Sequence, residues 1–338
     1  MRIPPLRRIE DTIPMCYGAT GTCISTRCRV ESRSCLMYEL TIIGAGPAGM
    51  TAAVYAARKK IKTLLVSQDV GGQAIWASKV ENYMGYQFIE GAELMRKFED
   101  QVKLFPITQM IGEEVTALAK ADSAFEIRTA GSEAHQAKSV ILATGKHPRL
   151  LNVPGEEKLR GRGVSYCAVC DGPLFSQQSV AVVGGGNAAL EAARDLVGIA
   201  NHVYLVSLTK ITGDRLVLEK LKDTSNFTAL LESEVLEIKG SKLVEGIRIR
   251  EQQTGRENEL HVGGVFVEIG RIPSSELAKD ITGVNRFGEV EVNRNCETSV
   301  PGLFAAGDVT DVPDKQIVIA AAEGAKAALQ AHRYLRSL

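Results

Sequence analysis

The chain lacks the features of proteins that bind nucleic acid or cross membranes. Its 338 residues carry 40 basic and 40 acidic side chains, so no net field attracts a polyanion or an anionic membrane surface. No apolar run approaches the ~20 residues that span a bilayer. The N-terminus also lacks the charged-then-apolar pattern of a signal peptide. These absences predict a soluble, globular, cytoplasmic protein with no nucleic-acid or membrane partner and room for about two domains.

Residues 1–36 lack lysine and clear apolar periodicity. They hold six arginines and four cysteines, and the first lysine of the chain is Lys59. A buried-strand pattern begins directly at Met37, so we interpret residues 1–36 as an N-terminal extension that is disordered or not native. A targeting peptide is an alternative, because the segment is rich in Arg, Ser and Thr and poor in acids. A zinc site fits less well, because these cysteines form no Cys-x-x-Cys pair.

Close cysteine pairs are scarce as well. Of the seven cysteines, only Cys167 and Cys170 lie two residues apart, and Asp171 follows directly. In a reducing compartment such a pair is more often catalytic or metal-binding than a structural staple. A zinc site needs two further ligands, and the rest of the folded body offers only Cys296 and scattered histidines. We therefore predict a redox dithiol and no metal, and we interpret Cys296 as a small buried residue.

The first glycine-rich turn follows an apolar strand, residues 40–43. It reads Gly44-Ala-Gly46-Pro-Ala-Gly49, precedes an Ala-rich helix over residues 50–60, and leads to a second strand over residues 63–67. In such units one glycine makes the tight turn, one lets the backbone approach a pyrophosphate, and one allows close helix–strand packing. The helix N-terminus then offers free N–H groups to the phosphates.

The same unit recurs. A strand over residues 179–183 leads to Gly184-Gly-Gly186-Asn-Ala-Ala189, a helix over residues 190–196 and a strand over residues 202–207. Gly44 and Gly184 are 140 residues apart, and so are Ser67 and Ser207. The two units align without a gap, which indicates an internal duplication of a dinucleotide-binding fold.

The remaining pattern suggests that one domain is inserted in the other. We expect an amphipathic helix over residues 90–105, strands over residues 115–119, 124–129, 140–145, 229–249 and 266–270, an apolar run over residues 302–309, and a closing helix over residues 316–335. The expected domains are residues 37–149 with 265–338, and residues 150–264. The two crossings, near residues 145–154 and 263–270, contain Gly or Pro and are candidate hinges.

Over residues 37–338 the chain resembles the low-molecular-weight thioredoxin reductases. It also resembles the reductase portion of the alkyl hydroperoxide reductase flavoprotein subunit. The sequence Cys170-Asp-Gly-Pro-Leu-Phe favours this second type. The motifs that carry the resemblance are Gly44–Gly49, Gly71-Gly-Gln73, Glu81-Asn82, Ala143-Thr-Gly145, Cys167-Ala-Val-Cys170-Asp171-Gly172, Gly184–Ala189, Gly307-Asp308-Val309 and Lys315-Gln316-Ile317. The resemblance implies an α/β fold with two Rossmann-like domains, each a three-layer ββα arrangement, the second inserted in the first.

The resemblance also implies two cofactor sites. FAD would be held by Gly44, Gly46, Pro47, Ala48, Gly49, Gly72, Gln73, Asn82, Ala143, Thr144, Gly145, Gly307, Asp308, Lys315, Gln316 and Ile317. NADPH or NADH would be held by Gly184, Gly186, Asn187, Ala188, Glu191 and Ser207. Asp308 suits a hydroxyl on independent grounds, because a carboxylate that follows a buried strand and a glycine needs a partner. It could equally cap a helix.

The implied activity is that of a thioredoxin-disulfide reductase. Electrons would pass from NAD(P)H through FAD to the disulfide of Cys167 and Cys170, and then to a thioredoxin-like protein. By analogy Cys170 faces the flavin, Cys167 attacks the partner and Asp171 protonates the leaving thiolate. The family also implies a homodimer, and an inserted domain that rotates to present the nicotinamide and the cysteines alternately.

The chain departs from the family where the nicotinamide nucleotide would bind. Thioredoxin reductases usually have His-Arg-Arg after the second strand of this unit, whereas this chain has Ser207-Leu-Thr209. Ser207 is also not the acid typical of NADH enzymes. Lys210 and Arg215 could reach a 2′-phosphate or could be solvated surface charges. The donor is therefore open among NADPH, NADH and reduced ferredoxin.

Two further functions are compatible with the sequence. One is an NADH-dependent flavoprotein of the alkyl hydroperoxide reductase type, which feeds a peroxiredoxin through a separate redox protein. The other is a non-catalytic flavin redox sensor, which would show negligible turnover with every disulfide partner.

Overall fold

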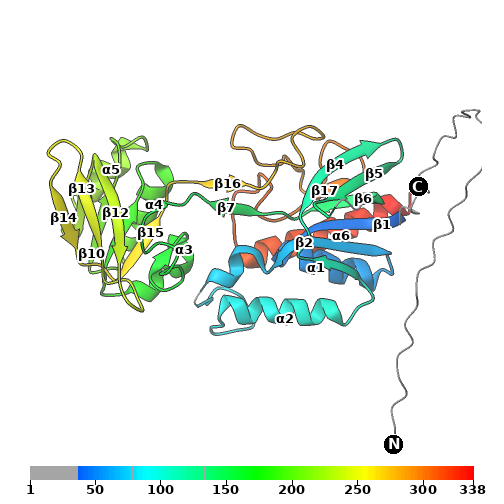
Figure 1. Ribbon diagram of the computed structural model, residues 1–338, viewed down its shortest axis with the longest axis horizontal. Helices are drawn as coiled ribbons and strands as arrows, with labels where there is room; N and C mark the ends of the chain where they lie inside the picture. The colour runs from blue at the N-terminus through cyan, green and yellow to red at the C-terminus, as the bar shows by residue number, and fades with distance from the viewer. Residues whose placement is uncertain (1–36, 78, 132–133) are drawn as a thin grey trace, which may run out of the picture. The chain divides into compact units, whose positions relative to one another are not determined.

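The computed structural model describes residues 37–77, 79–131 and 134–338 (Figure 1). The predictions for the extension at residues 1–36, including its four cysteines, lie outside the described residues. The described residues belong to a single compact unit. None of the helices within these three ranges is long and apolar enough to cross a membrane.

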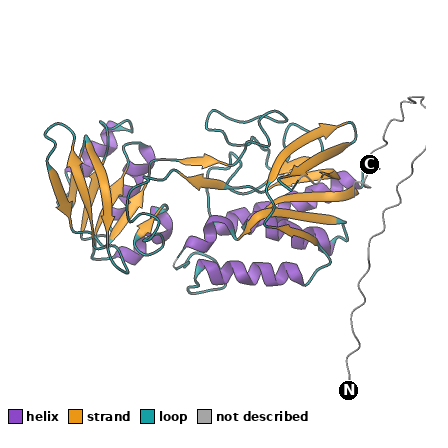
Figure 2. Ribbon diagram, in the orientation of Figure 1, coloured by secondary structure: helices purple, strands orange, loops and turns teal. Residues whose placement is uncertain are grey.

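The first sheet contains seven strands and begins at Met37. Five of them, in the order β3-β2-β1-β6-β17, are parallel, and the antiparallel strands β5 and β4 extend the sheet from β6. The bounds are β1 (Met37–Ala45), β2 (Thr63–Val70), β3 (Thr108–Ile111), β4 (Val115–Ala121), β5 (Ala124–Thr129), β6 (Ala134–Leu142) and β17 (Leu303–Ala305). Figure 2 shows these strands with helices along one side of the sheet.

Three helices accompany this sheet: α1 (Pro47–Arg58), α2 (Gly91–Lys103) and α6 (Ile317–Leu335). The predicted helix over residues 50–60 begins three residues earlier, because Pro47 occupies its first turn, where the missing N–H costs nothing. Small side chains allow α1 and α6 to pack closely. A Cβ atom added at Gly324 would lie 2.0 Å from the backbone oxygen of Ala48. This packing places Gly324 of α6 against the first turn of α1.

The second sheet contains five parallel strands in the order β11-β10-β9-β15-β8. Their bounds are β8 (Val164–Ser165), β9 (Ser179–Val183), β10 (His202–Val206), β11 (Phe227–Leu230) and β15 (Gly264–Val267). A separate antiparallel sheet joins β12 (Ser233–Lys239), β13 (Gly246–Glu251) and β14 (Glu257–Leu260). The associated helices are α3 (Ala168–Asp171), α4 (Asn187–Val197) and α5 (Arg215–Lys222), with a short 3₁₀ helix at Gly172–Phe175. Another 3₁₀ helix, Gly72–Trp76, follows β2 in the first fold.

The pairing register repeats between the two sheets. Leu40 of β1 pairs with Thr63 of β2, and Val180 of β9 pairs with Val203 of β10. Each residue of the second pair lies 140 positions after its counterpart in the first pair, as the glycine turns do. In both sheets a third strand, β6 or β15, pairs with the other side of β1 or β9. The predicted fold class, two Rossmann-like folds with the second inserted in the first, is confirmed.

In each sheet one more parallel strand pairs with the third strand, β6 or β15, and it comes from a different part of the chain in the two sheets. In the first sheet it is β17, which comes from the C-terminal part of the chain and pairs with β6. In the second sheet it is β8, which precedes β9 in the chain and pairs with β15. The redox pair immediately follows β8, so this strand places the cysteines at the carboxyl end of the second sheet.

One predicted domain boundary lies at strand β15. The boundary between residues 264 and 265 falls inside β15, whose Val265–Val267 segment pairs with β9 in the second sheet. Beyond β15, strand β16 (Arg271–Pro273) pairs antiparallel with β7 (Lys146–Pro148), which follows β6. The first hinge candidate, residues 145–154, contains β7, whereas the second, residues 263–270, ends before β16. We therefore place both crossings on this two-stranded ribbon.

Candidate active site

One cavity collects almost all of the predicted flavin-site residues. All sixteen except Gly49 line it, and so do Cys167, Cys170 and Asp171. The lining also includes polar and aromatic residues that the sequence did not single out, among them Asp69, Trp76, Lys146, Arg160 and Arg271. The redox pair and the first glycine turn therefore share a single cavity.

The first glycine turn has the conformation that the motif requires. Gly44 has φ +105°, and a Cβ atom there would lie 2.3 Å from the oxygen of Ala143. A Cβ atom at Gly49 would lie 1.8 Å from the oxygen of Gly44, so Gly49 serves packing behind the cavity. Gly46 instead faces open space, with nothing within 4 Å of its Cβ position, at the N-terminus of α1. This open approach to free helix N–H groups fits a dinucleotide pyrophosphate.

Polar side chains join distant parts of the chain around this cavity. Asn82 Nδ2 donates a 2.9 Å hydrogen bond to Oε1 of Gln316, across 234 positions of sequence. Gln73 Nε2 donates to the backbone oxygen of Lys146. Asn82 and Gln316, which the sequence grouped only by resemblance, are thus in direct contact, and Gln73 is bonded to the backbone just after Gly145.

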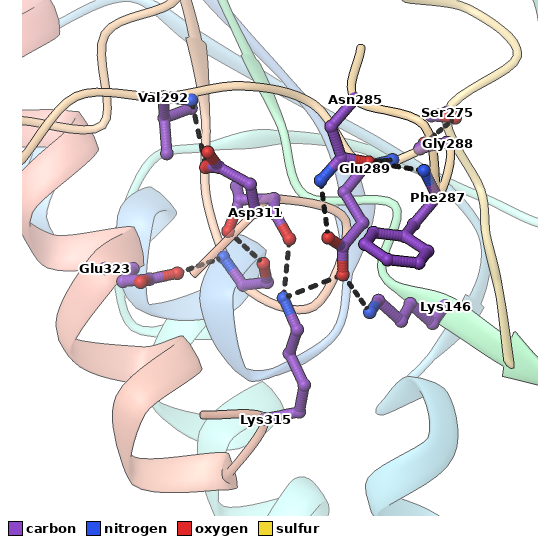
Figure 3. Close-up of polar contacts among 12 residues, drawn as sticks. Lys146, Ser275, Asn285, Phe287, Gly288, Glu289, Val292, Asp311, Lys315 and Glu323 are labelled. Carbon is purple, nitrogen blue, oxygen red and sulfur yellow. Dashed lines mark hydrogen bonds and ion pairs between the residues drawn. The ribbon is translucent and has the colours of Figure 1, made fainter. Parts of the chain in front are cut away.

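Lys146 and Lys315, which line the cavity, belong to a charged cluster (Figure 3). The ammonium groups of Lys146 and Lys315 both approach Oε1 of Glu289, Lys315 at 3.7 Å, and none of the three side chains is more than 14% exposed. Asn285 Nδ2 donates a 2.8 Å hydrogen bond to the other carboxylate oxygen. Burial raises the pKa of Glu289, but the hydrogen bonds from Lys146 and Asn285 outweigh it, so that the net pKa is lowered. Sequence reasoning missed Lys146 and Glu289.

A buried and a partly buried carboxyl group lie near the predicted ribityl-binding segment. Asp308 lines the cavity, and Glu323 on α6 accepts a 2.7 Å hydrogen bond from the N–H of Gly307 through Oε2. Burial raises the pKa of both groups, and the charge of Lys315 partly opposes this for each. Because Glu323 fixes the backbone before Asp308, it positions that carboxyl group. No motif signalled Glu323, which lies within an Ala-rich helix.

The redox pair is a disulfide between Cys167 and Cys170. Cys167 precedes the single turn of α3, and its Sγ accepts a 3.2 Å hydrogen bond from the N–H of Cys170. Both residues are partly exposed, whereas Cys296 is buried and free. Burial and the nearby Glu323 carboxyl group raise the pKa of Cys296 to about 11, which suits an inert core thiol.

Asp171 is held beside the disulfide by Ser165. Ser165 Oγ donates a hydrogen bond of 2.6 Å to Oδ2 of Asp171, and the N–H of Cys167 donates to Ser165 Oγ at 3.1 Å. Oδ1 of Asp171 is buried without a hydrogen-bond partner among the described residues. Burial raises the pKa of Asp171, and the Ser165 hydrogen bond lowers it in part. A buried carboxyl group with a raised pKa beside two thiols suits a proton donor.

The second glycine turn lies outside this cavity. Gly184 has φ +150°, and Gly186, at the N-terminus of α4, again has nothing within 4 Å of its Cβ position. The other four predicted residues differ in exposure: Asn187, Ala188 and Glu191 are exposed or partly exposed, and Ser207 is buried. This turn offers the same open approach to helix N–H groups as the first.

The side chain of Ser207 does not point into open space. A Cβ atom at Gly185 would lie 2.4 Å from Ser207 Oγ, so this hydroxyl packs beneath the turn. Asn187 Oδ1 accepts a 2.8 Å hydrogen bond from the N–H of Asp214 and thereby ties the loop at residues 208–214 to the turn. Lys210 and Arg215, at this loop, are exposed.

A second acid near the disulfide was missed. Glu268 follows β15, and its Oε1 accepts a 3.4 Å hydrogen bond from the N–H of Ala168 in α3, across 100 positions of sequence. Burial raises the pKa of Glu268 to about 7, partly opposed by the charge of Arg271 and this hydrogen bond. The one sequence signal was an acid within an otherwise apolar run.

Comparison with known proteins identifies the family. A family model described as pyridine nucleotide-disulphide oxidoreductase matches residues 38–327. The chain belongs to this family. An alkyl hydroperoxide reductase subunit of Staphylococcus aureus (strain MRSA252) is 40% identical over 299 residues, which cover 88% of this chain and 59% of that protein. The chain thus spans less than two thirds of the curated relatives that it matches.

Solved structures of thioredoxin reductases are similar over nearly the whole family region. The enzyme of Streptococcus pyogenes is 36% identical with a TM-score of 0.86, and the match covers 90% of this chain and all of that chain. The enzyme of Giardia duodenalis is 32% identical with a TM-score of 0.82, covering 89% of this chain and 99% of that one. The predicted resemblance is confirmed: the chain is a pyridine nucleotide-disulphide oxidoreductase by family and shares its fold with solved thioredoxin reductases.

Proposed function

We propose that the protein is a thioredoxin-type disulfide reductase. It would take electrons from NADPH or NADH and deliver them, through FAD and the Cys167–Cys170 pair, to the disulfide of a small thioredoxin-like protein. The observation that carries this proposal is that the Cys167–Cys170 disulfide lines the same cavity as the first glycine turn. The homology to structures named thioredoxin reductase supports it.

The residues of the cavity fit FAD. The backbone around Gly46 would bind the pyrophosphate, Asp308 would accept a hydroxyl of the ribityl chain, and Asn82 and Gln316 would lie along it. FAD, when bound, supplies the two-electron link between a nicotinamide and a disulfide. The second turn, around Gly186, would bind the nicotinamide nucleotide in the same way.

The cysteines then exchange their disulfide with the partner. With the pair reduced, the thiolate of Cys167 attacks one sulfur of the partner's disulfide, and a mixed disulfide forms as the partner's other sulfur leaves. Asp171 donates a proton to that leaving thiolate. Cys170 next attacks Cys167, which restores the Cys167–Cys170 disulfide and releases the partner as a dithiol. The second partner thiolate takes its proton from solvent.

A second candidate function is supported by the similarity to subunits of alkyl hydroperoxide reductase. In that case a thioredoxin-like carrier would pass the electrons on to a peroxiredoxin. The chemistry at Cys167 and Cys170 would be the same, and only the acceptor would differ. Turnover with oxidised thioredoxin alone, compared with peroxide consumption in the presence of a carrier and a peroxiredoxin, distinguishes the two.

The testing experiment separates flavin reduction from disulfide turnover. The purified protein should be yellow and bleach anaerobically with NADPH or NADH, and it should reduce oxidised thioredoxin. Cys167→Ser and Cys170→Ser should each abolish turnover while flavin reduction persists. Cys296→Ala, at the buried thiol outside the cavity, is the matched control and should retain turnover.

Four outcomes would contradict the proposal. A colourless protein would exclude the FAD site, and full thioredoxin turnover in both serine variants would exclude the dithiol route. Bleaching by reduced ferredoxin but by neither nucleotide would replace the proposed donor. Negligible turnover of the wild type with every disulfide partner would favour a redox sensor.

A further inference from the structure

We propose that Glu268 is a positioning residue of the dithiol site, whose charge controls how readily Cys167 forms a thiolate. The proposal rests on the proposed function, because it assumes that Cys167 and Cys170 cycle between disulfide and dithiol. It concerns a second carboxyl group, distinct from Asp171, directly after strand β15, which pairs with β8.

The backbone fixes Glu268 in place. Its N–H donates a 2.8 Å hydrogen bond to the oxygen of Val183 at the end of β9, and β15 pairs with both β9 and β8. On the other side, a Cβ atom at Gly184 would lie 2.3 Å from the backbone oxygen of Glu268. The residue is therefore held at the carboxyl end of the sheet, between the second glycine turn and the turn that bears the cysteines.

The side chain of Glu268 is directed to the redox turn. Its Oε1 accepts the hydrogen bond from the N–H of Ala168, the residue next to Cys167. The Asp171 carboxyl group, at the other end of the same short helix, is bonded to Ser165 instead. The disulfide turn thus has a separate carboxyl group at each of its ends.

Charged and titratable groups lie on two elements near Glu268, β16 and the redox turn. Arg271 of β16 is the cation whose charge favours the ionised carboxylate, and Arg271 itself donates a hydrogen bond to the oxygen of Tyr166, just before Cys167. Asp171 of α3 and the two cysteines are the other titratable groups on the redox turn. Burial works against ionisation of Glu268 and raises its pKa to about 7. Its charge therefore changes near neutrality.

The charge of Glu268 affects the protons that the cysteines take up when the disulfide is reduced. Reduction of the disulfide breaks one S–S bond and needs two electrons, which FAD would supply when bound, and two protons to give two neutral thiols. Asp171 can provide one of these protons. A carboxylate next to Cys167 repels a thiolate there, so ionised Glu268 raises the thiol pKa, and protonation of Glu268 removes this effect. The two groups consequently titrate as a coupled pair.

The test uses Glu268→Gln, which removes the charge and keeps a carbonyl acceptor for the N–H of Ala168. The reduced holoenzyme is alkylated anaerobically with iodoacetamide at a series of pH values from acid to alkaline, and labelling of Cys167 is followed by mass spectrometry of its peptide. At acid pH wild type and variant should react at the same rate. Above neutral pH the variant should react several-fold faster, because its Cys167 pKa stays low.

Two further variants make the result specific. Glu268→Asp keeps the charge and should retain the wild-type dependence on pH, with its inflection near neutrality. Glu219→Gln, on the exposed face of α5, should match the wild type at every pH. Thermal unfolding of each variant reports whether it is folded, and Glu268→Asp alone still tests the inflection if Glu268→Gln does not fold.

The proposal is overturned if the rate ratio of Glu268→Gln to wild type is constant across the pH series. It is equally overturned if the folded Glu268→Asp variant loses the neutral inflection. Because alkylation needs no protein partner, these results do not depend on which disulfide protein is the substrate. The proposed function fails on a different observation, namely disulfide turnover that persists in both cysteine-to-serine variants.

Discussion

Ser165 Oγ lies 2.6 Å from Oδ2 of Asp171 and donates a hydrogen bond to it. Ser165 ends β8 and Asp171 ends α3, so this bond closes the turn that contains both cysteines. The hydroxyl favours the ionised carboxylate, whereas burial favours the neutral acid and is the larger effect. This pair therefore controls whether a proton is available beside the disulfide.

Asp171→Asn should slow disulfide turnover by about 100-fold or more, because general acid catalysis typically contributes 10²–10⁴. Flavin reduction by the nicotinamide nucleotide should be unchanged, since that step needs no proton from Asp171. Anaerobic stopped-flow absorbance of the flavin measures the first step, and steady-state thioredoxin reduction measures the second. Equal losses in both steps would mean that Asp171 has a structural role.

Ser165→Ala should move the alkaline limb of the pH profile of disulfide turnover to higher pH. The variant loses the bond that lowers the pKa of Asp171, so the folded pKa rises further. An acid catalyst is active while protonated, and activity falls as the pH rises through its pKa. A pH profile of kcat/KM measures the shift, and a limb that moves to lower pH would contradict the proposed role of Asp171.

The two glycine turns allow a matched pair of substitutions. Gly46→Ala and Gly186→Ala each add a methyl group in open space, at backbone angles that alanine tolerates. Gly46→Ala should be purified with little flavin, whereas Gly186→Ala should be yellow but have a much higher KM for the nucleotide. Flavin absorbance per protein and nucleotide titration measure the two effects.

The control for this pair is Gly49→Ala. Its Cβ atom would lie 1.8 Å from the oxygen of Gly44, so it should lower the thermal stability rather than act on one cofactor alone. If Gly46→Ala retains a full complement of FAD, the first turn is not the pyrophosphate site.

Glu289→Gln should destabilise the protein by about 2 kcal/mol near neutral pH, because it leaves Lys146 and Lys315 buried without their counter-charge. The pKa of Glu289 is lowered in the folded state, so its stabilisation is present above its unfolded pKa and is lost as the pH falls through the folded value. Urea unfolding should therefore show a difference in the free energy of unfolding between variant and wild type that is smaller at acid pH than at neutral pH.

Glu93→Gln is the control for that measurement. Glu93 pairs with Lys97 on the exposed face of α2 at 3.4 Å, and such surface pairs contribute little. A difference for Glu289→Gln that persists unchanged at acid pH would show that the effect comes from packing rather than charge.

The double variant Lys210→Ala, Arg215→Ala tests the nucleotide preference. Both cations are exposed beside the loop that Asn187 ties to the second turn. If a 2′-phosphate binds there, the KM for NADPH should rise about 10-fold or more, as expected for the loss of charge-assisted hydrogen bonds, with the KM for NADH unchanged. Equal effects on both nucleotides, or none, would place the phosphate contact elsewhere.

Local sequence patterns were sufficient to predict the strands and helices that flank the two glycine turns. The strand at residues 179–183 was predicted with its observed bounds, because a short apolar run ended by glycine has few alternatives. The Ala-rich helices were found within a few residues. The 140-residue repeat extended to the pairing register, since the same strand lengths and turns leave the same partners opposite each other.

Contacts made across the chain were not predictable in this way. Glu268 meets Ala168 only because β15 lies between β8 and β9, and a strand order of this kind is not visible in one sequence. The same holds for Lys146 and Glu289, which are 143 positions apart. The ribbon of β7 and β16 was missed because its strands are three residues long, which is too short to show an alternation of apolar and polar residues.

The ribbon of β7 and β16 makes the second fold a separable module. The segment between Pro148 and Arg271 leaves and returns through directly paired residues, so its two ends lie about one strand spacing apart, ~5 Å. A segment whose ends are adjacent can be cut out, or replaced by a homologous one, without stretching the fold that remains. A single exchange of this segment would therefore replace the second glycine turn and the cysteine pair together and leave the flavin-binding fold unchanged.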